Sequence, residues 1–141
     1  MRILIVDRSA QIIERLEEII AEACNITAIH GAVTYEEAKK LCMENTYEVV
    51  LLDIDLPESL KLVKEIKKTG GNSCIIIQFT HIDTYTRERC KLAGVDFFFD
   101  KYYDFEKISG LLDIVSLIVA KKDQEKGDDW VNRLLTGLDC K

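Results

Sequence analysis

The sequence predicts an α/β protein with a doubly wound sheet of five parallel strands and helices on both faces of the sheet. Two observations predict this class. Short apolar runs alternate with helical patterns over the first 121 residues. The runs are unbroken rather than alternating with polar residues, which is typical of strands that are covered on both faces. Repeated strand–helix units give a parallel sheet whose crossovers are right-handed.

Five short apolar segments are the expected strands. The four strongest are continuous runs of apolar residues, at 3–6, 49–52, 74–77 and 97–99. A weaker run at 26–29 takes the second place in chain order.

Three helices are expected between the first four strands. Residues 9–24 place apolar side chains on one face at a spacing of 3.6 residues. Thr34 and Glu37 have the spacing of a capping box, which opens a helix that runs to about residue 45. Pro57 stands where the first turn of the third helix could begin, and a Gly-Gly pair at 70–71 ends that helix.

Two further helices are expected at 83–93 and 104–121, the second capped by Asp104. The last helix carries one apolar stripe that suffices to pack on the sheet, at Phe105, Ile108, Leu112, Val115 and Val119. A second apolar stripe is expected to face outward, at Leu111, Ile114 and Ile118. Large exposed apolar patches usually mark interaction sites, so this helix is a candidate surface for self-association.

The chain divides into a domain at 1–121 and an appended segment at 122–141. The appended segment is a polar linker followed by a short amphipathic tail with Trp130, Leu134 and Leu138. Its length of 141 residues suits one domain. Two arrangements of the tail stay open. Either it joins the last helix in a homodimer, or it folds back and covers the outward stripe within one chain.

Composition narrows the classes of function. Apolar residues make up 48% and charged residues 31%, which is ordinary globular composition. The net charge of −6 argues against a nucleic-acid partner, which needs a basic surface. No apolar run approaches the length of a membrane span or a signal peptide, so we expect a cytoplasmic protein without membrane contact. The five cysteines include no close pair and are expected to be free thiols.

Function in such a sheet lies outside the carboxyl ends of the strands. Asp7 follows the first apolar run, Asp53 the third, Thr80 the fourth and Lys101 the fifth. Two carboxylates, one hydroxyl and one ammonium group are therefore expected at the same edge.

The segments that carry these residues read ILIVDRS, VVLLDIDLP, IIIQFT and FFFDK. Over about residues 1–120 they resemble the receiver domain of two-component response regulators. The resemblance implies a flavodoxin-like sheet with strand order 2-1-3-4-5, as in CheY-like proteins, and a single-domain regulator.

The resemblance also implies roles for individual residues. Asp53 would accept a phosphoryl group from a histidine kinase or phosphotransfer protein. Thr80 and Lys101 would bind the phosphoryl oxygens, and Thr80 and Phe98 would form the switch that a downstream protein reads. Mg²⁺ would be held by Asp7, Asp53 and the backbone carbonyl of Asp55.

The chemistry of the expected pocket agrees with these roles. A carboxylate that attacks a phosphoryl group meets repulsion between two anions, which a divalent cation and a lysine reduce. Mg²⁺ prefers a few carboxylate or carbonyl oxygens together with water and phosphate oxygens.

The chain departs from the family pattern close to the pocket. Arg8 stands where a second acidic residue is usual, and His81 replaces the usual small residue after Thr80. Tyr102 replaces the proline that usually follows Lys101. The Asp-Gly pair that usually follows Pro57 is missing, so the third helix is expected to start about two residues early.

Arg8 changes the charge of the expected pocket. Asp7 and Asp53 are balanced by Arg8 and Lys101, so the pocket is neutral before any metal binds, and Mg²⁺ binding should be weakened. Two orientations of Arg8 stay open. Its guanidinium either points inward and pairs with Asp53, which would lower the pKa of that carboxyl, or leaves the pocket for Asp55 or solvent.

We interpret the chain as a phosphoacceptor switch that signals by docking partner proteins and is not an enzyme. One alternative is a degenerate receiver that acts through protein contacts without phosphorylation. The other is a phosphatase similar to haloacid dehalogenases, in which Asp53 and Asp55 would form the DxD motif. That family needs a later acidic pair after another strand, whereas the pair at 128–129 lies in a polar segment.

Overall fold

The structure is a computed structural model that describes all residues of the chain except 23–25, 70–72, 102–103, 109, 114 and 118–141. The appended segment at 122–141 and the pair at 128–129 therefore lie outside the described residues.

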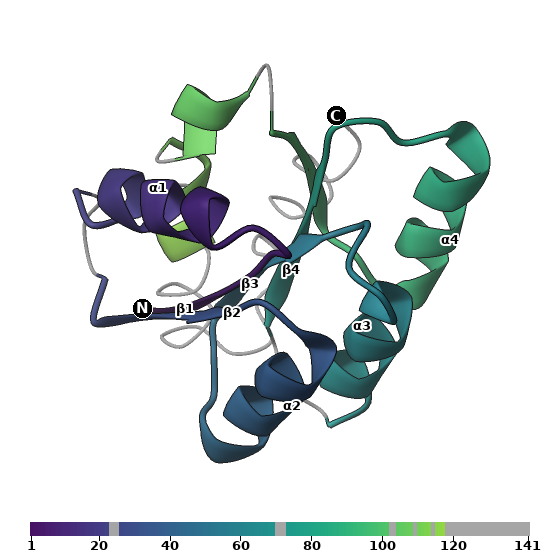
Figure 1. Ribbon diagram of the computed structural model, residues 1–141, viewed down its shortest axis with the longest axis horizontal. Helices are drawn as coiled ribbons and strands as arrows, with labels where there is room; N and C mark the ends of the chain where they lie inside the picture. The colour runs from purple at the N-terminus through teal and green to yellow at the C-terminus, as the bar shows by residue number, and fades with distance from the viewer. Residues whose placement is uncertain (23–25, 70–72, 102–103, 109, 114, 118–141) are drawn as a thin grey trace.

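Five parallel strands form one sheet at the centre of the molecule (Figure 1). In chain order they are β1 Arg2–Val6, β2 Ala28–Ala32, β3 Val49–Asp53, β4 Cys74–Phe79 and β5 Phe97–Asp100. Their order across the sheet is β2-β1-β3-β4-β5, which is the flavodoxin-like arrangement that the resemblance implies. The predicted fold class and strand order are confirmed.

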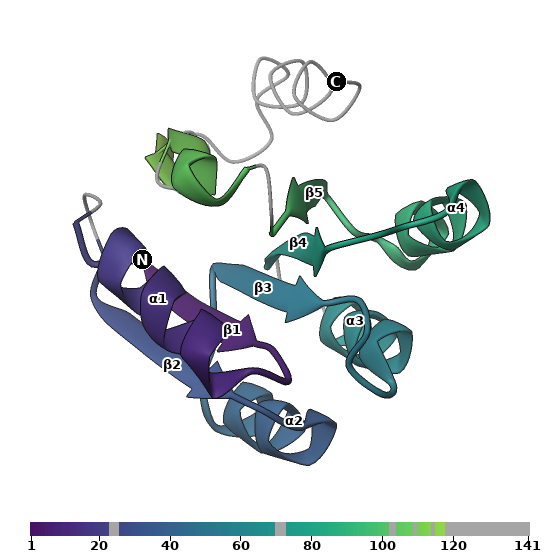
Figure 2. The same cartoon turned by 45° about the horizontal axis from the view of Figure 1, so that its top comes forward.

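Helices cover both faces of the sheet (Figure 2). They are α1 Ala10–Ile20, α2 Tyr35–Glu44, α3 Ser59–Lys68 and α4 Thr84–Ala93, followed by a 3-10 turn at Phe105–Lys107. The described residues between 108 and 117 continue that turn as a helix. One apolar cluster joins the sheet to α1 and this last helix, and another joins it to α2, α3 and α4.

Burial of the strands explains why their apolar runs are unbroken. All five residues of β3 are buried, and side chains on alternate positions enter the two clusters on opposite faces. Leu4 and Val6 contribute to one cluster, and Ile3 and Ile5 contribute to the other. A polar side chain inside such a strand would lose its water on either face.

Two predicted elements shift or shorten in the structure. The weak second strand lies at Ala28–Ala32, two residues later than its apolar run. The first helix spans Ala10–Ile20, within its predicted range of 9–24. It begins after Ser9, because Ser9 is the cap and its side chain accepts a hydrogen bond from the backbone N–H of Ile12 at 3.3 Å. The predicted cap of α2 is confirmed, since Thr34 Oγ1 accepts from the backbone N–H of Glu37 at 3.1 Å.

Pro57 does not begin the third helix, as its place in the sequence had suggested. α3 begins at Ser59, because Leu56 to Ser59 form a tight turn closed by a hydrogen bond of 3.1 Å from Ser59 N to Leu56 O. Glu58 has φ 66° and ψ 22°, the left-handed conformation at the third position of a type II turn. Pro57 therefore takes the second turn position, which suits its fixed φ equally well.

The last helix differs from its prediction in its first turn. Asp104 occupies the capping position, but its side chain makes no capping bond. Its carboxylate instead accepts a hydrogen bond from the backbone N–H of Asp100 at 3.3 Å. Leu111 is half-buried against the core rather than facing outward, whereas Leu117 is 60% exposed. Ile114 and Ile118 lie outside the described residues.

Candidate functional site

Four of the predicted site residues meet at the carboxyl edge of the sheet. Asp7 follows β1, Asp53 ends β3, Thr80 follows β4 and Lys101 follows β5. A shallow cleft of about 350 Å³ opens at this edge and is lined by Asp7, Arg8, Ser9, Ile12, Thr80 and Lys101. Parallel strands bring their carboxyl ends together, which is why residues far apart in sequence converge here.

Lys101 joins the two carboxylates. Its Nζ lies 2.7 Å from Asp7 Oδ2 and 3.1 Å from Asp53 Oδ1. Asp7 is 1% exposed and Asp53 is fully buried. A buried carboxylate loses its hydration, so each of these anions depends on the shared ammonium group.

The structure answers the open question of where Arg8 points. Its Nε lies 2.9 Å from Asp53 Oδ2, and its Nη2 lies 3.4 Å from Asp55 Oδ2. The guanidinium therefore points inward and also reaches Asp55, combining the two orientations that the sequence left open. Its side chain is 54% exposed, so it lies on the solvent side of the buried Asp53.

The charges around Asp53 control its protonation. Burial alone would raise the pKa of Asp53, but the Arg8 hydrogen bond and the Lys101 charge outweigh burial and lower the pKa below its ordinary value. In return, the hydrogen bond to Asp53 raises the pKa of Arg8. Asp53 is therefore held as a carboxylate.

Hydrogen-bond donors occupy all four carboxylate oxygens of the pair. Asp53 Oδ1 accepts from Lys101 and from the backbone N–H of Asp55 at 3.0 Å. Asp53 Oδ2 accepts from Nε and the backbone N–H of Arg8. Asp7 Oδ2 accepts from Lys101, and Asp7 Oδ1 accepts from the backbone N–H of Ser9 at 2.8 Å.

This donor arrangement does not fit Mg²⁺. The ion prefers an octahedron of oxygen ligands, and here the carboxylate oxygens already face two cations. For Mg²⁺ to bind an oxygen of both Asp7 and Asp53, at least one of the cations Lys101 and Arg8 would first have to move away. Within the described part of the chain, no group of three His, Cys, Asp or Glu side chains is placed to hold a metal.

Sequence reasoning missed Gln78. This residue is fully buried in β4, and its Nε2 lies 3.4 Å from Asp7 Oδ2. Its Oε1 has no hydrogen-bond partner among the residues that the structure describes. The available signal was one amide in an otherwise apolar strand, which is unusual because a buried amide normally satisfies its hydrogen bonds.

The remaining predicted residues lie at the rim or beside it. Thr80 lines the cleft and is exposed to solvent. His81 is also exposed, and it is not among the described residues that line the cleft. Phe98 is half-buried, and the guanidinium carbon of Arg87 lies 4.3 Å from the centre of its ring. Tyr102 lies outside the described residues.

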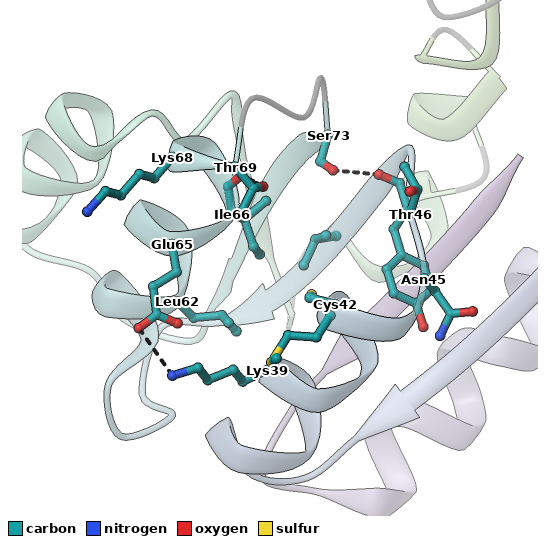
Figure 3. Close-up of a pocket in the computed structure, with 13 residues that line it drawn as sticks. Lys39, Cys42, Asn45, Thr46, Leu62, Glu65, Ile66, Lys68, Thr69 and Ser73 are labelled. Atoms are coloured by element: carbon teal, nitrogen blue, oxygen red, sulfur yellow. Dashed lines mark hydrogen bonds and ion pairs between the residues drawn. The ribbon is translucent and has the colours of Figure 1, made fainter.

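A second cavity lies at the opposite edge of the sheet, between the C-terminal parts of α2 and α3 (Figure 3). It has a volume of about 730 Å³, and its wall includes Cys42, Tyr47, Leu62 and Ile66. Burial raises the pKa of the Cys42 thiol to about 11, so this thiol stays protonated near neutral pH.

Comparison with models of protein families identifies the family of this chain. The model of the response regulator receiver domain matches residues 3–113. The chain belongs to this family. As a receiver domain of a two-component response regulator, it has the CheY-like fold that its strand order shows.

Similar proteins agree with this assignment. A curated relative, the sensory transduction protein LytR of Staphylococcus haemolyticus, is 26% identical over 126 residues. The match covers 88% of this chain but 48% of that protein, so the chain spans about half the length of this relative.

Solved structures share the fold. A DNA-binding response regulator of the LuxR family from Staphylococcus aureus superposes with a TM-score of 0.73 at 22% identity, covering 81% of this chain and 97% of that chain. The response regulator domain of Thermotoga maritima CheB gives 0.69 at 20% identity, covering 83% and 94%.

Receiver domains are in general signalling domains rather than enzymes. They commonly bind Mg²⁺ in the acidic pocket and interact with histidine kinases and downstream targets. The described part of this receiver contains no helix long and apolar enough to cross a membrane.

Proposed function

We propose that this receiver is a cytoplasmic signalling switch that accepts a phosphoryl group on Asp53 and then docks a downstream protein. The observation that carries the proposal is the contact of 3.1 Å between Lys101 Nζ and the Asp53 carboxylate, at the carboxyl end of the central strand β3. Thr80 lines the same cleft from the next strand.

The pocket supports the transfer step electrostatically. The low pKa of Asp53 keeps its nucleophilic oxygens unprotonated at neutral pH. Lys101 is 10% exposed and contacts both carboxylates, so its charge acts where little water screens it. Once Asp53 carries a phosphoryl group, Lys101 and Thr80 can bind the new oxygens only in that state, which biases the domain toward the docked conformation.

Labelling with a small phosphodonor tests the proposal. The full chain is treated with acetyl phosphate, and its intact mass is followed over time. We expect a mass gain of one phosphoryl group, which fragmentation assigns to Asp53. Asp53→Asn should abolish the gain, whereas the matched variant Asp55→Asn should retain it because Asp55 is half-exposed outside the buried pair. Equal labelling of Asp53→Asn and the wild type would reject the assignment.

A second function is favoured by one observation. Both Asp53 oxygens already accept hydrogen bonds from charged side chains, which would suit a receiver that signals by protein contacts without phosphorylation. The same labelling experiment separates the two functions. A wild type that stays unlabelled under conditions that label Arg8→Asp would support this second function.

A phosphatase remains the proposal from another class of function. Its test is turnover of p-nitrophenyl phosphate by the same preparation. Sustained turnover that Asp53→Asn abolishes would replace the signalling proposal, whereas a single labelling event without turnover supports the switch.

We further propose that the last helix and the segment after it form a homodimer surface. Support comes from Leu117, an apolar side chain that is 60% exposed. Sedimentation velocity of the full chain beside a chain ending at Lys121 tests this surface. Concentration-dependent dimerisation of the full chain is expected. If the full chain and the shortened chain both sediment as monomers at high micromolar concentration, the proposed surface does not exist.

A further inference from the structure

We infer that the Arg8 guanidinium is a built-in cation that replaces the divalent metal, so that the pocket accepts a phosphoryl group without Mg²⁺. The inference rests on the proposed phosphoacceptor role of Asp53 and adds the kind of cation that the reaction uses.

Geometry places Arg8 where such a cation is needed. Its Nε lies 2.9 Å from Asp53 Oδ2, on the solvent side from which a phosphodonor must approach the buried carboxylate. A guanidinium presents several N–H donors in one plane, which matches the oxygens of a phosphoryl group. Its contact of 3.4 Å with Asp55 Oδ2 holds the side chain over this place from a second direction.

The net charge of the pocket also supports replacement of the metal by Arg8. A phosphorylated Asp53 carries about two negative charges. Together with Asp7, Arg8 and Lys101 it leaves the pocket with a net charge of about one negative unit. An acidic residue at position 8 would leave about three negative units, which one divalent cation would reduce to the same single unit. Arg8 without a metal and an acidic residue with Mg²⁺ are therefore equivalent in net charge.

The carboxylate oxygens point to the same conclusion. All four oxygens of Asp7 and Asp53 accept hydrogen bonds, and the cations Arg8 and Lys101 contact three of them. A divalent ion that bound both carboxylates would have to displace at least one of these cations. It would also be repelled by the positive charges of Arg8 and Lys101 nearby. Arg8 therefore disfavours the ion and also supplies the positive charge.

The transfer step balances without a metal. An Asp53 oxygen forms a bond to phosphorus, while the bond from phosphorus to the donor breaks and its electron pair leaves with the donor. A phosphohistidine with a proton on its other ring nitrogen departs as neutral imidazole, and acetyl phosphate departs as acetate. Arg8 and Lys101 keep their protons and contact the phosphoryl oxygens as negative charge builds on them.

Labelling with and without metal tests the inference. The wild type, Arg8→Asp and the matched surface variant Arg89→Asp are treated with acetyl phosphate in Mg²⁺ or in EDTA. Wild type and Arg89→Asp should label equally in both conditions, within about twofold. Arg8→Asp should label at least about tenfold more slowly in EDTA, because its pocket lacks the cation. A wild type that slows tenfold or more in EDTA overturns the inference, although Asp53 would remain the phosphoacceptor.

Metal binding without a phosphodonor gives an independent readout. Mn²⁺ takes similar oxygen ligands, and the electron paramagnetic resonance signal of the free ion measures how much is bound. Arg8→Asp should bind Mn²⁺ at least about tenfold more tightly than the wild type, and Arg8→Asn should fall between them. Equal affinities in the three proteins overturn the inference even if no protein is labelled, whereas absence of labelling alone counts against the proposed function. Circular dichroism confirms that each variant is folded.

Discussion

The two edges of the sheet stabilise their buried polar groups with different kinds of partner. At the carboxyl edge, Asp7 and Asp53 are buried as anions, and Lys101 and Arg8 contact them as cations. At the amino edge, the ion pair of Lys67 and Asp96 is partly exposed, and the buried polar groups around an apolar cavity are neutral. There Ser73 Oγ donates to the backbone carbonyl of Tyr47, and the Tyr47 hydroxyl lies 2.6 Å from His30 Nδ1.

This difference predicts how much stability is lost when one partner of a buried polar group is removed at either edge. A buried charge without its partner keeps the full cost of lost hydration, whereas a neutral hydroxyl loses much less. Removal of the buried cation Lys101 should therefore have the largest effect, whereas the half-exposed Arg8 and the neutral groups of the amino edge should have smaller ones. The following variants test that order.

Lys101→Met should have the largest effect. It leaves the buried carboxylates of Asp7 and Asp53 facing one another without the ammonium group between them. We expect the free energy of unfolding to fall by about 3–5 kcal/mol at neutral pH. Urea denaturation followed by circular dichroism measures it, and a loss below about 1 kcal/mol would contradict the comparison.

Arg8→Met should have a smaller effect that depends on pH. The pKa of Asp53 is lowered in the folded protein, so its stabilising contribution is present above the ordinary value of 3.8 and is lost as pH falls through the folded pKa. Without Arg8 the pKa of Asp53 rises toward the unfolded value, so this contribution is smaller and its loss on acidification is complete at a higher pH. Since Arg8 is half-exposed, we expect a cost of only about 1 kcal/mol at neutral pH. Urea denaturation from pH 2 to 7 checks both, and superimposable acid limbs would count against the ion pair.

Tyr47→Phe tests the amino edge. The variant loses the hydrogen bond with His30 while keeping the ring and the backbone carbonyl that Ser73 uses. We expect a loss of about 0.5–1.5 kcal/mol in the free energy of unfolding. An effect as large as that of Lys101→Met would remove the distinction between the two edges.

Lys39→Met should have the smallest effect. Its Nζ lies 4.0 Å from Glu65 Oε1, and both side chains are partly exposed at the wall of the cavity. Such ion pairs contribute little, so we expect a change within about 0.5 kcal/mol. Thermal melting in low and high salt would detect a larger, salt-sensitive contribution.

The sheet could be predicted from the sequence because strands that are buried on both faces appear as unbroken apolar runs. Unbroken runs such as 3–6 and 74–77 are tolerated only where no strand face meets water, so they locate strands well. The meeting of Asp7, Asp53 and Lys101 followed from strand ends alone.

Other features depend on packing that local sequence does not carry. Pro57 suits both a first helical turn and the second position of a tight turn, and the wrong choice moved the start of α3. Arg8 has a side chain long enough to reach Asp53 or Asp55, and it contacts both. The cavity between α2 and α3 depends on how closely two helices approach, which no spacing pattern records.

The left-handed backbone at Glu58 makes the turn before α3 a place for engineering. A residue with a side chain in this conformation costs about 1 kcal/mol relative to its right-handed form. Glycine would remove that cost but would give the unfolded chain more freedom, so its gain is partly cancelled. Asparagine tolerates the conformation without that freedom. Substitution of Glu58 could therefore change the thermostability of the domain. It would leave Arg8 and Lys101, the cations that contact Asp53, unchanged.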